Sequence, residues 1–573
     1  MPPLPAHASA WQSATWDLLA PHYQELVDAP LTDATLRAWV ARWSALDATI
    51  DEAHALAMNA YTANTRDADA EAVYLRWGNE ISPRLQEVRV QLGRRLLPFR
   101  TQLPDLGLFL REVATDVELF REANLPRLAA LEEMSATYEK IAGGLTVTWD
   151  GATKTVPELQ PFLHSPDRGV RERAFRAGAQ AYLAHRDELA ELMSAMIRTR
   201  HAVAREAGFA DYRDYAFRAK CRFDYTPEDC MRFHAAIETA VVPAVRRLDE
   251  ERRRRLGVET LRPWDLVVSP DRTAPLVPFT DAAELVAGGQ RIFDAVDPEL
   301  GDYFRTMAHE ELLDLPNRPG KAPGGYCVKL PARGRPFIFM NAVGVPDDVA
   351  TLVHESGHAF HAFLTAGMPY IWPRDTPHEA AELASMSMEL LAAPYLARPT
   401  GFYAVPDAAD AQLEHLELLL RDLPHIASVD AFQHWLYTEG VEATPDERDA
   451  AWLRVRTRFE AGTLDWSGLE RERIARWYRQ PHIFTSPFYY IEYGLAQLGA
   501  LQVWRASLRD PERALRCYKA ALALGYTVPL PEIYETAGAS LLFEAAPMAR
   551  LVSEVEARIA ELRAMHVASP VAS

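Results

Sequence analysis

Apolar residues recur three and four positions apart along most of the chain, which is the spacing that buries one face of an α-helix. The same stretches are rich in Ala, Leu, Glu and Arg, all of which are good helix formers. We therefore predict a mainly α fold. The pattern is clearest at residues 71–96, 171–207, 227–256 and 411–421.

Strand patterns, in which apolar and polar residues alternate, are rare enough to place one by one. Residues 145–156 alternate around Asp150-Gly151, a dipeptide that favours the tight turn of a hairpin. Residues 326–330 and 337–341 predict a second hairpin. The preceding residues, 316–325, contain three prolines and three glycines and predict a long irregular loop.

The first hairpin marks a soft domain boundary near residue 160 in a chain of 573 residues. We expect a helical N-terminal region, 1–160, followed by a larger and mainly helical region, 161–562, that carries the candidate chemistry. The last residues, 563–573, are rich in small side chains and are expected to form a flexible tail.

Charge and cysteine content restrict the partners and the location. A net charge of −19 argues against a nucleic-acid or anionic-membrane partner, because phosphate binding needs a positive surface. No apolar run is long enough to cross a bilayer, and the first residues lack the features of a signal peptide, so we expect a cytoplasmic protein. The four cysteines form no C-x-x-C pair and are expected to be reduced structural thiols.

Residues 347–366 predict one helix whose polar face carries a metal-binding motif. His354 and His358 are four residues apart, so they lie one turn apart and about 40° apart around the helix axis, opposite the apolar face. Two imidazoles at this spacing suit one Zn²⁺, with Glu355 beside the metal to hold its water. The motif also occurs by chance, so the assignment needs support from other segments.

A second helix is predicted to begin at Thr376-Pro377-His378-Glu379, which has the pattern of a capping box with proline in the first turn. On this helix Glu382 and Glu389 are seven residues apart and share a face. Glu382, which has small neighbours, is the candidate third zinc ligand and leaves a fourth position for water. Glu389 is the candidate to hydrogen-bond a ligating imidazole. Either glutamate could instead be a solvated helix residue.

His361 shares the helix face of His354 and His358. A three-histidine site of the type H-E-x-x-H-x-x-G-x-x-H needs glycine at position 361 and histidine at position 364, where this chain has His361 and Leu364. We therefore interpret His361 as a satisfied histidine that supports the site and is not a ligand.

A third candidate segment lies far downstream. A helix that begins with the capping box Ser467-Gly-Leu-Glu470 is predicted to stop at Pro481, and the next helix to begin at Pro487. An aromatic stripe at helical spacing is more often packing, but beside a zinc site an imidazole or a tyrosine hydroxyl can donate to the oxyanion of peptide hydrolysis. The candidate residues around this break are His482, Tyr489, Tyr490 and Tyr493.

Together these segments resemble the thimet oligopeptidase and oligoendopeptidase F family of gluzincin peptidases, most closely the Pz-peptidase type. The resemblance covers roughly residues 140–550, and the segments occur in the family's order. The matching segments are His354-Glu-Ser-Gly-His358-Ala-Phe-His361, Glu382-Leu-Ala-Ser-Met-Ser-Met-Glu389, Gly320-Lys-Ala-Pro-Gly-Gly-Tyr-Cys327, Arg335-Pro-Phe-Ile-Phe-Met-Asn341 and Pro487-Phe-Tyr-Tyr-Ile-Glu-Tyr493-Gly-Leu-Ala-Gln497.

The resemblance implies a large helical, clam-like fold with a deep central channel, one Zn²⁺ per chain at its floor and a few short antiparallel strands next to the zinc helix. Such a channel admits short oligopeptides and excludes folded proteins. The family's residues near the oxyanion correspond to His482, Tyr489 and Tyr493, and the choice between Tyr489 and Tyr490 stays open.

The resemblance also implies a substrate-binding surface. Residues 337–341 would be the edge strand that pairs with the substrate backbone, and a flexible glycine-containing loop would lie over the substrate. The residues implied to bind substrate are Gly324, Gly325, Tyr326, Phe339, Asn341 and Tyr490.

We therefore expect a zinc metalloendopeptidase that cuts internal bonds of short unstructured oligopeptides, with Glu355 as general base and then acid toward a zinc-activated water. A zinc carboxypeptidase or another exopeptidase is the alternative among enzymes. A non-catalytic peptide-binding or metal-binding protein is a further alternative, which Glu355 disfavours because binding alone does not need it. The oligomeric state, monomer or homo-oligomer, stays open.

Overall fold

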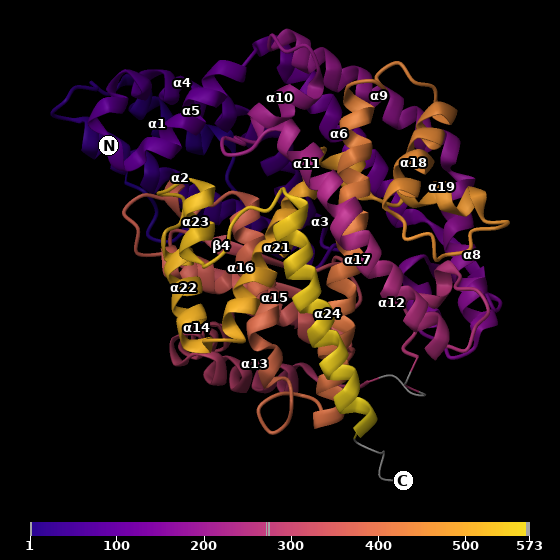
Figure 1. Cartoon of the computed structure of the whole chain (residues 1–573). Coiled ribbons are helices and arrows are strands. Elements are labelled where there is room, and N and C mark those ends of the chain that lie inside the picture. The colour runs from indigo at the N-terminus through magenta and orange to yellow at the C-terminus, as the bar shows by residue number, and fades with distance from the viewer. Residues whose placement is uncertain (1–2, 271, 273–275, 569–573) are drawn as a thin grey trace.

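Helices carry most of the regular structure, as the spacing of apolar positions predicts (Figure 1). The computed structural model describes residues 3–270, 272 and 276–568. Among these residues, no helix combines the length and the apolar composition that a membrane crossing needs. The helices of the first half are α1 (Trp16–Asp28), α2 (Leu36–Ala63), α3 (Ala68–Arg76), α4 (Ser82–Leu96), α5 (Gly107–Leu119), α6 (Leu125–Gly144), α7 (Gln160–Leu163), α8 (Arg168–Ala184), α9 (Arg186–Glu206), α10 (Tyr212–Ala219), α11 (Pro227–Ala236) and α12 (Val242–Arg255).

The second half contains the helices that surround the candidate site. They are α13 (Ala282–Val296), α14 (Pro298–His309), α15 (Pro346–Thr365), α16 (His378–Ala392), α17 (Val405–Tyr437), α18 (Pro445–Phe459), α19 (Glu470–Tyr478), α20 (Pro481–Thr485), α21 (Tyr490–Ser507), α22 (Pro511–Ala523), α23 (Leu530–Thr536) and α24 (Ala545–Ala568). The strands are β1 (Thr146–Trp149), β2 (Ala152–Thr155), β3 (Leu313–Pro316), β4 (Tyr326–Leu330) and β5 (Arg335–Ala342).

The long stretches predicted to be helical are confirmed, but some contain breaks that their periodicity does not reveal. Residues 171–207 form two helices, α8 and α9, which meet at His185. Residues 227–256 form α11 and α12, joined by a single π turn. Apolar residues keep their three- and four-residue spacing on both sides of each break, so the pattern continues through it.

The hairpin predicted around Asp150-Gly151 is confirmed. Strands β1 and β2 pair antiparallel, with Trp149 opposite Ala152. The two turn residues have φ angles of 47° and 84°. A two-residue hairpin turn of this kind needs positive φ at both central positions, which aspartate and glycine adopt at low cost.

The second hairpin, β4 with β5, is also confirmed, but the prediction that residues 337–341 form an edge strand is wrong. The strand order is β3-β5-β4, so β5 is the central strand. β4 pairs with it antiparallel on one side, and β3 pairs with it parallel on the other. β3 is only four residues long and ends in Pro316, which is too short for alternation to reveal it. The free edge nearest the hairpin therefore belongs to β4.

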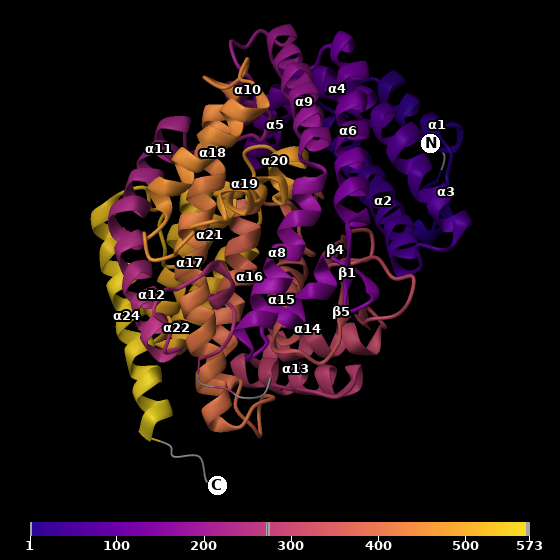
Figure 2. The same ribbon diagram turned by 90° about the vertical axis from the view of Figure 1, so that its right-hand side faces the viewer.

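Two large hydrophobic cores divide the described residues. The smaller core is formed within residues 8–113, and the larger one includes Leu131 and continues to Leu562. The N-terminal helices accordingly lie together at one side of the molecule (Figures 1 and 2). The domain boundary near residue 160 stays a prediction. The flexible tail predicted at 563–573 begins in regular structure, since α24 continues to Ala568, and residues 569–573 lie outside the described residues.

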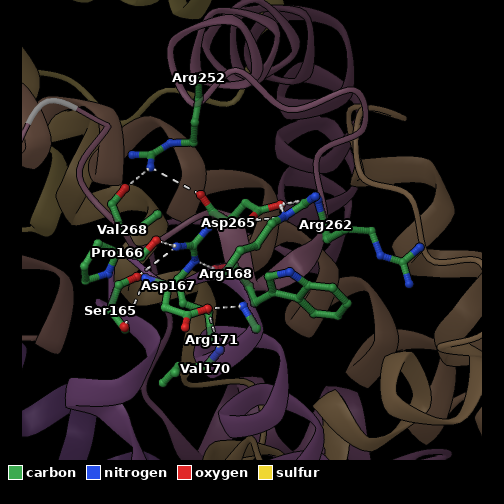
Figure 3. A network of polar contacts seen from close by, with 12 residues as sticks. Ser165, Pro166, Asp167, Arg168, Val170, Arg171, Arg252, Arg262, Asp265 and Val268 are labelled. Carbon is green, nitrogen blue, oxygen red and sulfur yellow. Dashed lines mark hydrogen bonds and ion pairs between the residues drawn. The ribbon is translucent and has the colours of Figure 1, made fainter.

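A buried network of charges ties α8 to the segment after α12 (Figure 3). The fully buried carboxylate of Asp265 accepts hydrogen bonds from Arg168 at 2.7 Å and from Arg171 at 2.9 Å. Arg252 donates to the backbone carbonyls of Asp265 and Val268. Two guanidinium groups thus offset the cost of burying one carboxylate, which is the usual requirement for a buried acid.

Candidate metal centre

The helix with the histidine motif, α15, begins at a proline and is held at its start by an acid. Asp348 Oδ2 accepts hydrogen bonds from the backbone N–H groups of Val343, Gly344 and Val345, at 2.8–2.9 Å. A carboxylate at this end also complements the positive pole of the helix. The helix buries the predicted apolar face, including Leu352 at 0% exposure, which turns the histidine face toward α16.

Helices α15 and α16 approach each other closely at Gly357. A Cβ atom at this position would lie 2.6 Å from the Cα of Ser385 and 2.8 Å from the carbonyl oxygen of Ala384. Glycine between the two histidines therefore permits the crossing that brings Glu382 to them. Such a contact between two helices cannot be read from the motif itself.

Helix α16 begins at His378, close to the predicted position, but the predicted capping box at Thr376 is wrong. The N-cap is Pro377, and no side chain caps the helix. Glu379 is buried, and its carboxylate accepts a hydrogen bond of 2.5 Å from the hydroxyl of Tyr225. Glu379 therefore makes a tertiary hydrogen bond with Tyr225 and not the capping interaction that the local pattern predicts.

Two imidazoles and one carboxylate converge between these helices. Glu382 Oε2 lies 3.5 Å from His354 Nε2 and 3.9 Å from His358 Nε2. One donor atom from each of the three residues lies within 4.8 Å of the other two. Two nitrogens and one oxygen are donors that Zn²⁺ accepts, and ligands about 2.0–2.2 Å from a zinc ion are separated by comparable distances. The residues present therefore fit a zinc ion.

Glu389 orients the first imidazole from behind. Its Oε1 lies 2.6 Å from His354 Nδ1, which leaves Nε2 free to face Glu382. Its Oε2 lies 2.8 Å from Nε2 of His415, a residue of α17 that sequence reasoning missed because nothing local distinguishes it. Burial alone would raise the pKa of Glu389, but these two imidazoles outweigh it and lower the pKa to about 2. A hydrogen bond to the outer ring nitrogen is the usual support of a metal-binding histidine.

The electrostatic field of the carboxylates at this site favours a cation. Burial alone would lower the pKa of His354, but the carboxylates of Glu382 and Glu389 raise it to about 10. His358 makes no comparably short contact, and burial lowers the pKa of its imidazole to about 4. A site that draws a proton so strongly to one ring will also attract a divalent cation.

Glu355 lies beside this cluster and is ready to accept a proton near neutrality. Burial raises the pKa of its carboxyl to about 7, with a further contribution from Glu382, and His354 opposes the shift. The backbone N–H of Cys327, at the start of β4, hydrogen-bonds its carboxylate. A Cβ atom on Gly325 would lie 3.9 Å from Glu355 Oε1, so the glycine-containing loop lies next to this carboxylate.

His361 is 4% exposed, and burial lowers the pKa of its ring to about 3. Its Nε2 has no hydrogen-bond partner among the described residues. The expectation of a fully satisfied histidine is therefore not met at this atom, and its supporting role stays a prediction.

The tyrosine segment begins differently from its local pattern. The helix before it starts at Glu470, three residues after the expected cap, because Ser467 hydrogen-bonds Asp465 and does not cap α19. His482 lies on the short helix α20, and α21 starts at Tyr490 and not at Pro487.

The residue before the tyrosines, Phe488, has a φ angle of 64°, which is rare for a side chain other than glycine. Its backbone N–H donates to Gln433 Oε1 at 3.1 Å, and its carbonyl accepts from Arg222. These contacts hold a left-handed turn that costs roughly 1–2 kcal/mol by itself. Tyr489 follows this turn directly, and its hydroxyl lies 3.5 Å from Nδ1 of His378, the first residue of α16.

His482 and two tyrosines form one aromatic group. The ring of His482 lies 5.5 Å from that of Tyr489 and 5.9 Å from that of Tyr493, and the two tyrosine rings are 5.2 Å apart. Burial raises the pKa of both tyrosines, and the Glu382 carboxylate adds to the shift. The two hydroxyls also hydrogen-bond each other, and both stay protonated near neutral pH.

Tyr490 also joins this group, with its ring centre 5.1 Å from that of His482 and 5.6 Å from that of Tyr493, but its hydroxyl has different neighbours. Its ring packs against His425 at 5.7 Å, and its pKa, raised to about 12, responds after burial to Asp422 and not to Glu382. This arrangement favours Tyr489 over Tyr490 as the tyrosine near the metal centre.

A relay of hydrogen bonds orients His482, and sequence reasoning did not find it. The amide nitrogen of Gln480 donates to His482 Nδ1 at 2.9 Å, and Gln480 Oε1 accepts from His425 Nε2 at 3.2 Å. With Nδ1 occupied as an acceptor, the proton of the neutral ring lies on Nε2. His482 can then act as a hydrogen-bond donor.

Most of the residues predicted to bind substrate are near β4, but two of them support the loop. Asn341 donates hydrogen bonds to the carbonyls of Ala322 and Gly324, at 2.7 and 2.9 Å. Phe339 is 1% exposed and stacks on Tyr326, with ring centres 4.8 Å apart. Gly324 has a φ angle of 98°, which favours glycine. Phe339 and Asn341 therefore hold the glycine-containing loop in place.

A cavity of about 310 Å³ lies beside β4. Its lining comes from α2, β4 and α15, and it includes His54, Met58, Cys327, Val328 and Lys329. His354, His358 and Glu382 do not line this cavity. Cys327 does line it, and the backbone N–H of Cys327 hydrogen-bonds Glu355. The cavity leaves room for a peptide substrate to lie along β4, beside helix α2.

The fold and the site together define the class of helical metallopeptidases, in which an H-E-x-x-H helix and a glutamate of a second helix supply the metal donors. The model of peptidase family M3 matches residues 162–551, and the chain belongs to this family.

Comparison with individual proteins agrees with this family. The chain is 28% identical to the solved structure of PZ peptidase A with inhibitor 2, with a TM-score of 0.88 over 96% of this chain and 98% of the other. Oligoendopeptidase-F from Enterococcus faecium shares the fold, with a TM-score of 0.63, 17% identity, and coverage of 97% and 98%. In sequence, Oligopeptidase PepF of Bacillus subtilis is 23% identical over 66% of this chain and 55% of its own length. The chain thus spans about half the length of this curated relative.

Proposed function

We propose that this protein is a zinc endopeptidase that hydrolyses internal peptide bonds of short unstructured oligopeptides. The observation that supports the proposal most is the convergence of His354, His358 and Glu382 beside the carboxylate of Glu355. Three protein donors from two helices, with room for a further ligand, are typical of a catalytic zinc site.

His354, His358 and Glu382 would hold the metal, and Glu389 would fix the orientation of His354. When bound there, zinc supplies Lewis acidity, which lowers the pKa of a water molecule and polarises a carbonyl oxygen. Glu355 accepts the proton of the attacking water and returns it to the leaving amine. Its pKa, raised to about 7, suits a group that must both take and give a proton near neutrality.

Tyr493, Tyr489 and His482 would donate hydrogen bonds to the oxyanion as charge develops on the carbonyl oxygen. Their proximity to one another and the effect of Glu382 on both tyrosines support this assignment. The Gln480 amide would keep the donor nitrogen of His482 turned toward the substrate.

The substrate backbone would extend along β4. This strand has β5 on only one side, and its Cys327 reaches Glu355. An extended peptide can add main-chain hydrogen bonds to such an edge. This replaces β5 as the recognition strand, since β5 has a neighbour on both sides.

The preference for oligopeptides is supported by similarity to a protein named oligopeptidase and by a site lined from several helices. The cytoplasmic location and the oligomeric state stay predictions.

The test is cleavage of a peptide of about ten residues whose two ends are blocked, followed by mass spectrometry of the fragments. We expect internal cuts at rates similar to those of the unblocked peptide, because an endopeptidase recognises neither terminal charge. Cleavage only of free-ended peptides, one residue at a time, would establish the exopeptidase alternative. Binding without cleavage in zinc-loaded protein would establish the non-catalytic one.

A further inference from the structure

A second group of metal-binding side chains is buried where α11 packs against α17. Cys230 and Asp430 are 0% exposed, and His434 is 3% exposed. One donor atom of each, a thiol sulfur, a carboxylate oxygen and a ring nitrogen, lies within 4.8 Å of the other two. None of these residues takes part in the chemistry proposed above.

The positions of these donors suit a metal ion after a small contraction. Zinc ligands lie about 2.0–2.3 Å from the metal, so tetrahedral donors are roughly 3.3–3.8 Å apart. His434 Nε2 is already 3.3 Å from Asp430 Oδ2. Donor atoms of this group that are as much as 4.8 Å apart would have to move about 1 Å closer together.

Several polar atoms of the group lack partners. Within the part of the chain that the structure describes, the two ring nitrogens of His434 make no hydrogen bond, and Oδ1 of Asp430 makes none either. The other oxygen of Asp430 accepts from His234 Nε2 at 2.8 Å. Buried polar groups are nearly always paired, so open donors this deep need an explanation. A metal ion would give a partner to one ring nitrogen of His434 and to the Asp430 carboxylate, and the second ring nitrogen of His434 would stay without one.

The charge of the group leads to the same conclusion. Asp265, described above, is buried against two guanidinium groups (Figure 3), whereas the ion pairs of Asp430 among the described residues involve only the imidazoles of His234 and His434. A buried carboxylate without a permanent cation is costly. A divalent ion with one thiolate, one carboxylate and a neutral imidazole sums to zero charge.

We propose that Cys230, Asp430 and His434 bind a second divalent metal ion, zinc by the chemistry of the donors, which joins α11 to α17. His234 would donate to the Asp430 carboxylate from outside the metal's shell and orient it. Binding forms a metal–sulfur bond and releases the thiol proton of Cys230 to solvent, so no oxidant or reductant is involved.

The position of the group gives the metal a structural role near the active site. The ring of His434 packs on Phe488 with centres 5.3 Å apart, and the adjacent Gln433 accepts the Phe488 N–H. Phe488 is the left-handed residue directly before Tyr489. A metal at His434 would therefore stabilise the base of the tyrosine segment.

The sequence signal for such a site is a pair of four-residue spacings on two distant helices. Cys230 and His234 lie one turn apart on α11, and Asp430 and His434 lie one turn apart on α17. Neither pair has the spacing of a zinc finger or of C-x-x-C, so cysteine spacing alone predicts only structural thiols.

The test begins with metal content, measured by mass spectrometry on protein produced with zinc present and then desalted. We expect about two zinc ions per chain. A brief treatment with a chelator should abolish peptidase activity and leave about one zinc per chain, because the second group is sealed whereas the side chains of His354 and His358 are 25% and 21% exposed.

A His358→Ala variant should likewise retain about one zinc ion. In that background Cys230→Ala should remove it, whereas the matched control Cys517→Ser, at another free cysteine, should keep it. Cobalt substitution supplies a signature independent of folding defects in the Cys230 variant. A near-ultraviolet sulfur-to-cobalt band is expected in cobalt-loaded wild type and His358→Ala protein, since only the second group contains a thiolate.

The proposal is overturned if wild-type protein holds one zinc ion, lost with His358→Ala, or if cobalt-loaded protein lacks the sulfur band. In either case the zinc endopeptidase proposal still stands, because it depends on the metal at His354, His358 and Glu382. Wild-type protein that binds zinc at Cys230, Asp430 and His434 but not at His354, His358 and Glu382 would instead support the second site and overturn the zinc endopeptidase proposal.

Discussion

The two groups of potential metal ligands in this molecule differ in what surrounds them. In the first, the side chains of His354, His358 and Glu382 keep 25%, 21% and 10% of their surface exposed, and a base, an edge strand and hydroxyl donors lie nearby. In the second, Cys230 and Asp430 are sealed. An open position for substrate distinguishes catalytic from structural metal sites, so donor type alone does not decide function.

The largest expected effect separates chemistry from folding at the first group. Glu355→Gln should lower kcat by at least ~10²–10⁴-fold, because an amide cannot accept the proton of the attacking water. Zinc content and melting temperature should change little. The matched control, Glu512→Gln at a side chain that is 90% exposed, should retain full activity. Normal turnover in Glu355→Gln protein would remove this residue from the mechanism.

Next in size is the effect of the tyrosine hydroxyls. Tyr493→Phe should lower kcat by about 10²–10³-fold with a smaller change in KM, because its hydroxyl acts mainly when the oxyanion forms. Tyr490→Phe should change kcat much less, because the ring of Tyr490 also packs against His425 and its pKa responds to Asp422 and not to Glu382. The opposite order of effects would reassign the oxyanion donor.

At the second group the expected loss is one of stability. Asp430→Asn should reduce the free energy of unfolding by roughly 2–4 kcal/mol, because it leaves the His234 and His434 side chains without their buried carboxylate. Chemical denaturation at equilibrium measures this. Activity per folded molecule should fall far less than in Glu355→Gln protein; an equal fall would mean that the two groups are not separate in function.

The pH dependence of kcat/KM reports the protonation of Glu355, the candidate general base. The pKa of Glu355 is raised, mainly by burial, to about 7, and a nearby divalent cation favours its charged form. The carboxylate is the active form, so kcat/KM should fall about tenfold per unit as pH drops through a pKa at or below about 7. A profile that stays flat down to about pH 4.5, near the ordinary glutamate pKa, would show that a different group limits the reaction.

The smallest expected effect concerns the relay behind His482. Gln480→Leu should lower kcat by several-fold and leave KM nearly unchanged, because the ring loses the hydrogen bond that selects its tautomer. Gln480→Glu, which can hold the ring only in the opposite tautomer or as a cation, should not restore the rate and should alter the pH profile. Recovery of full activity with Glu would exclude a positioning role.

Local patterns in the sequence were enough for several parts of this protein. Helical periodicity predicted the mainly α fold, and the four-residue spacing of His354 and His358 placed both rings on one face. Asp150-Gly151 predicted its hairpin. These properties depend on backbone geometry over a few residues, which the residue types restrict directly.

Only the tertiary structure decided which distant groups meet. The close approach of α15 and α16 at Gly357 brings Glu382 to the histidines. Glu379 hydrogen-bonds Tyr225 and does not form the predicted helix cap. β5 became a central strand because a four-residue strand, β3, pairs with it. Packing between helices and strands depends on side-chain fit across long sequence separations, which no local spacing encodes. For the same reason, the second group of potential ligands becomes visible only where α11 meets α17.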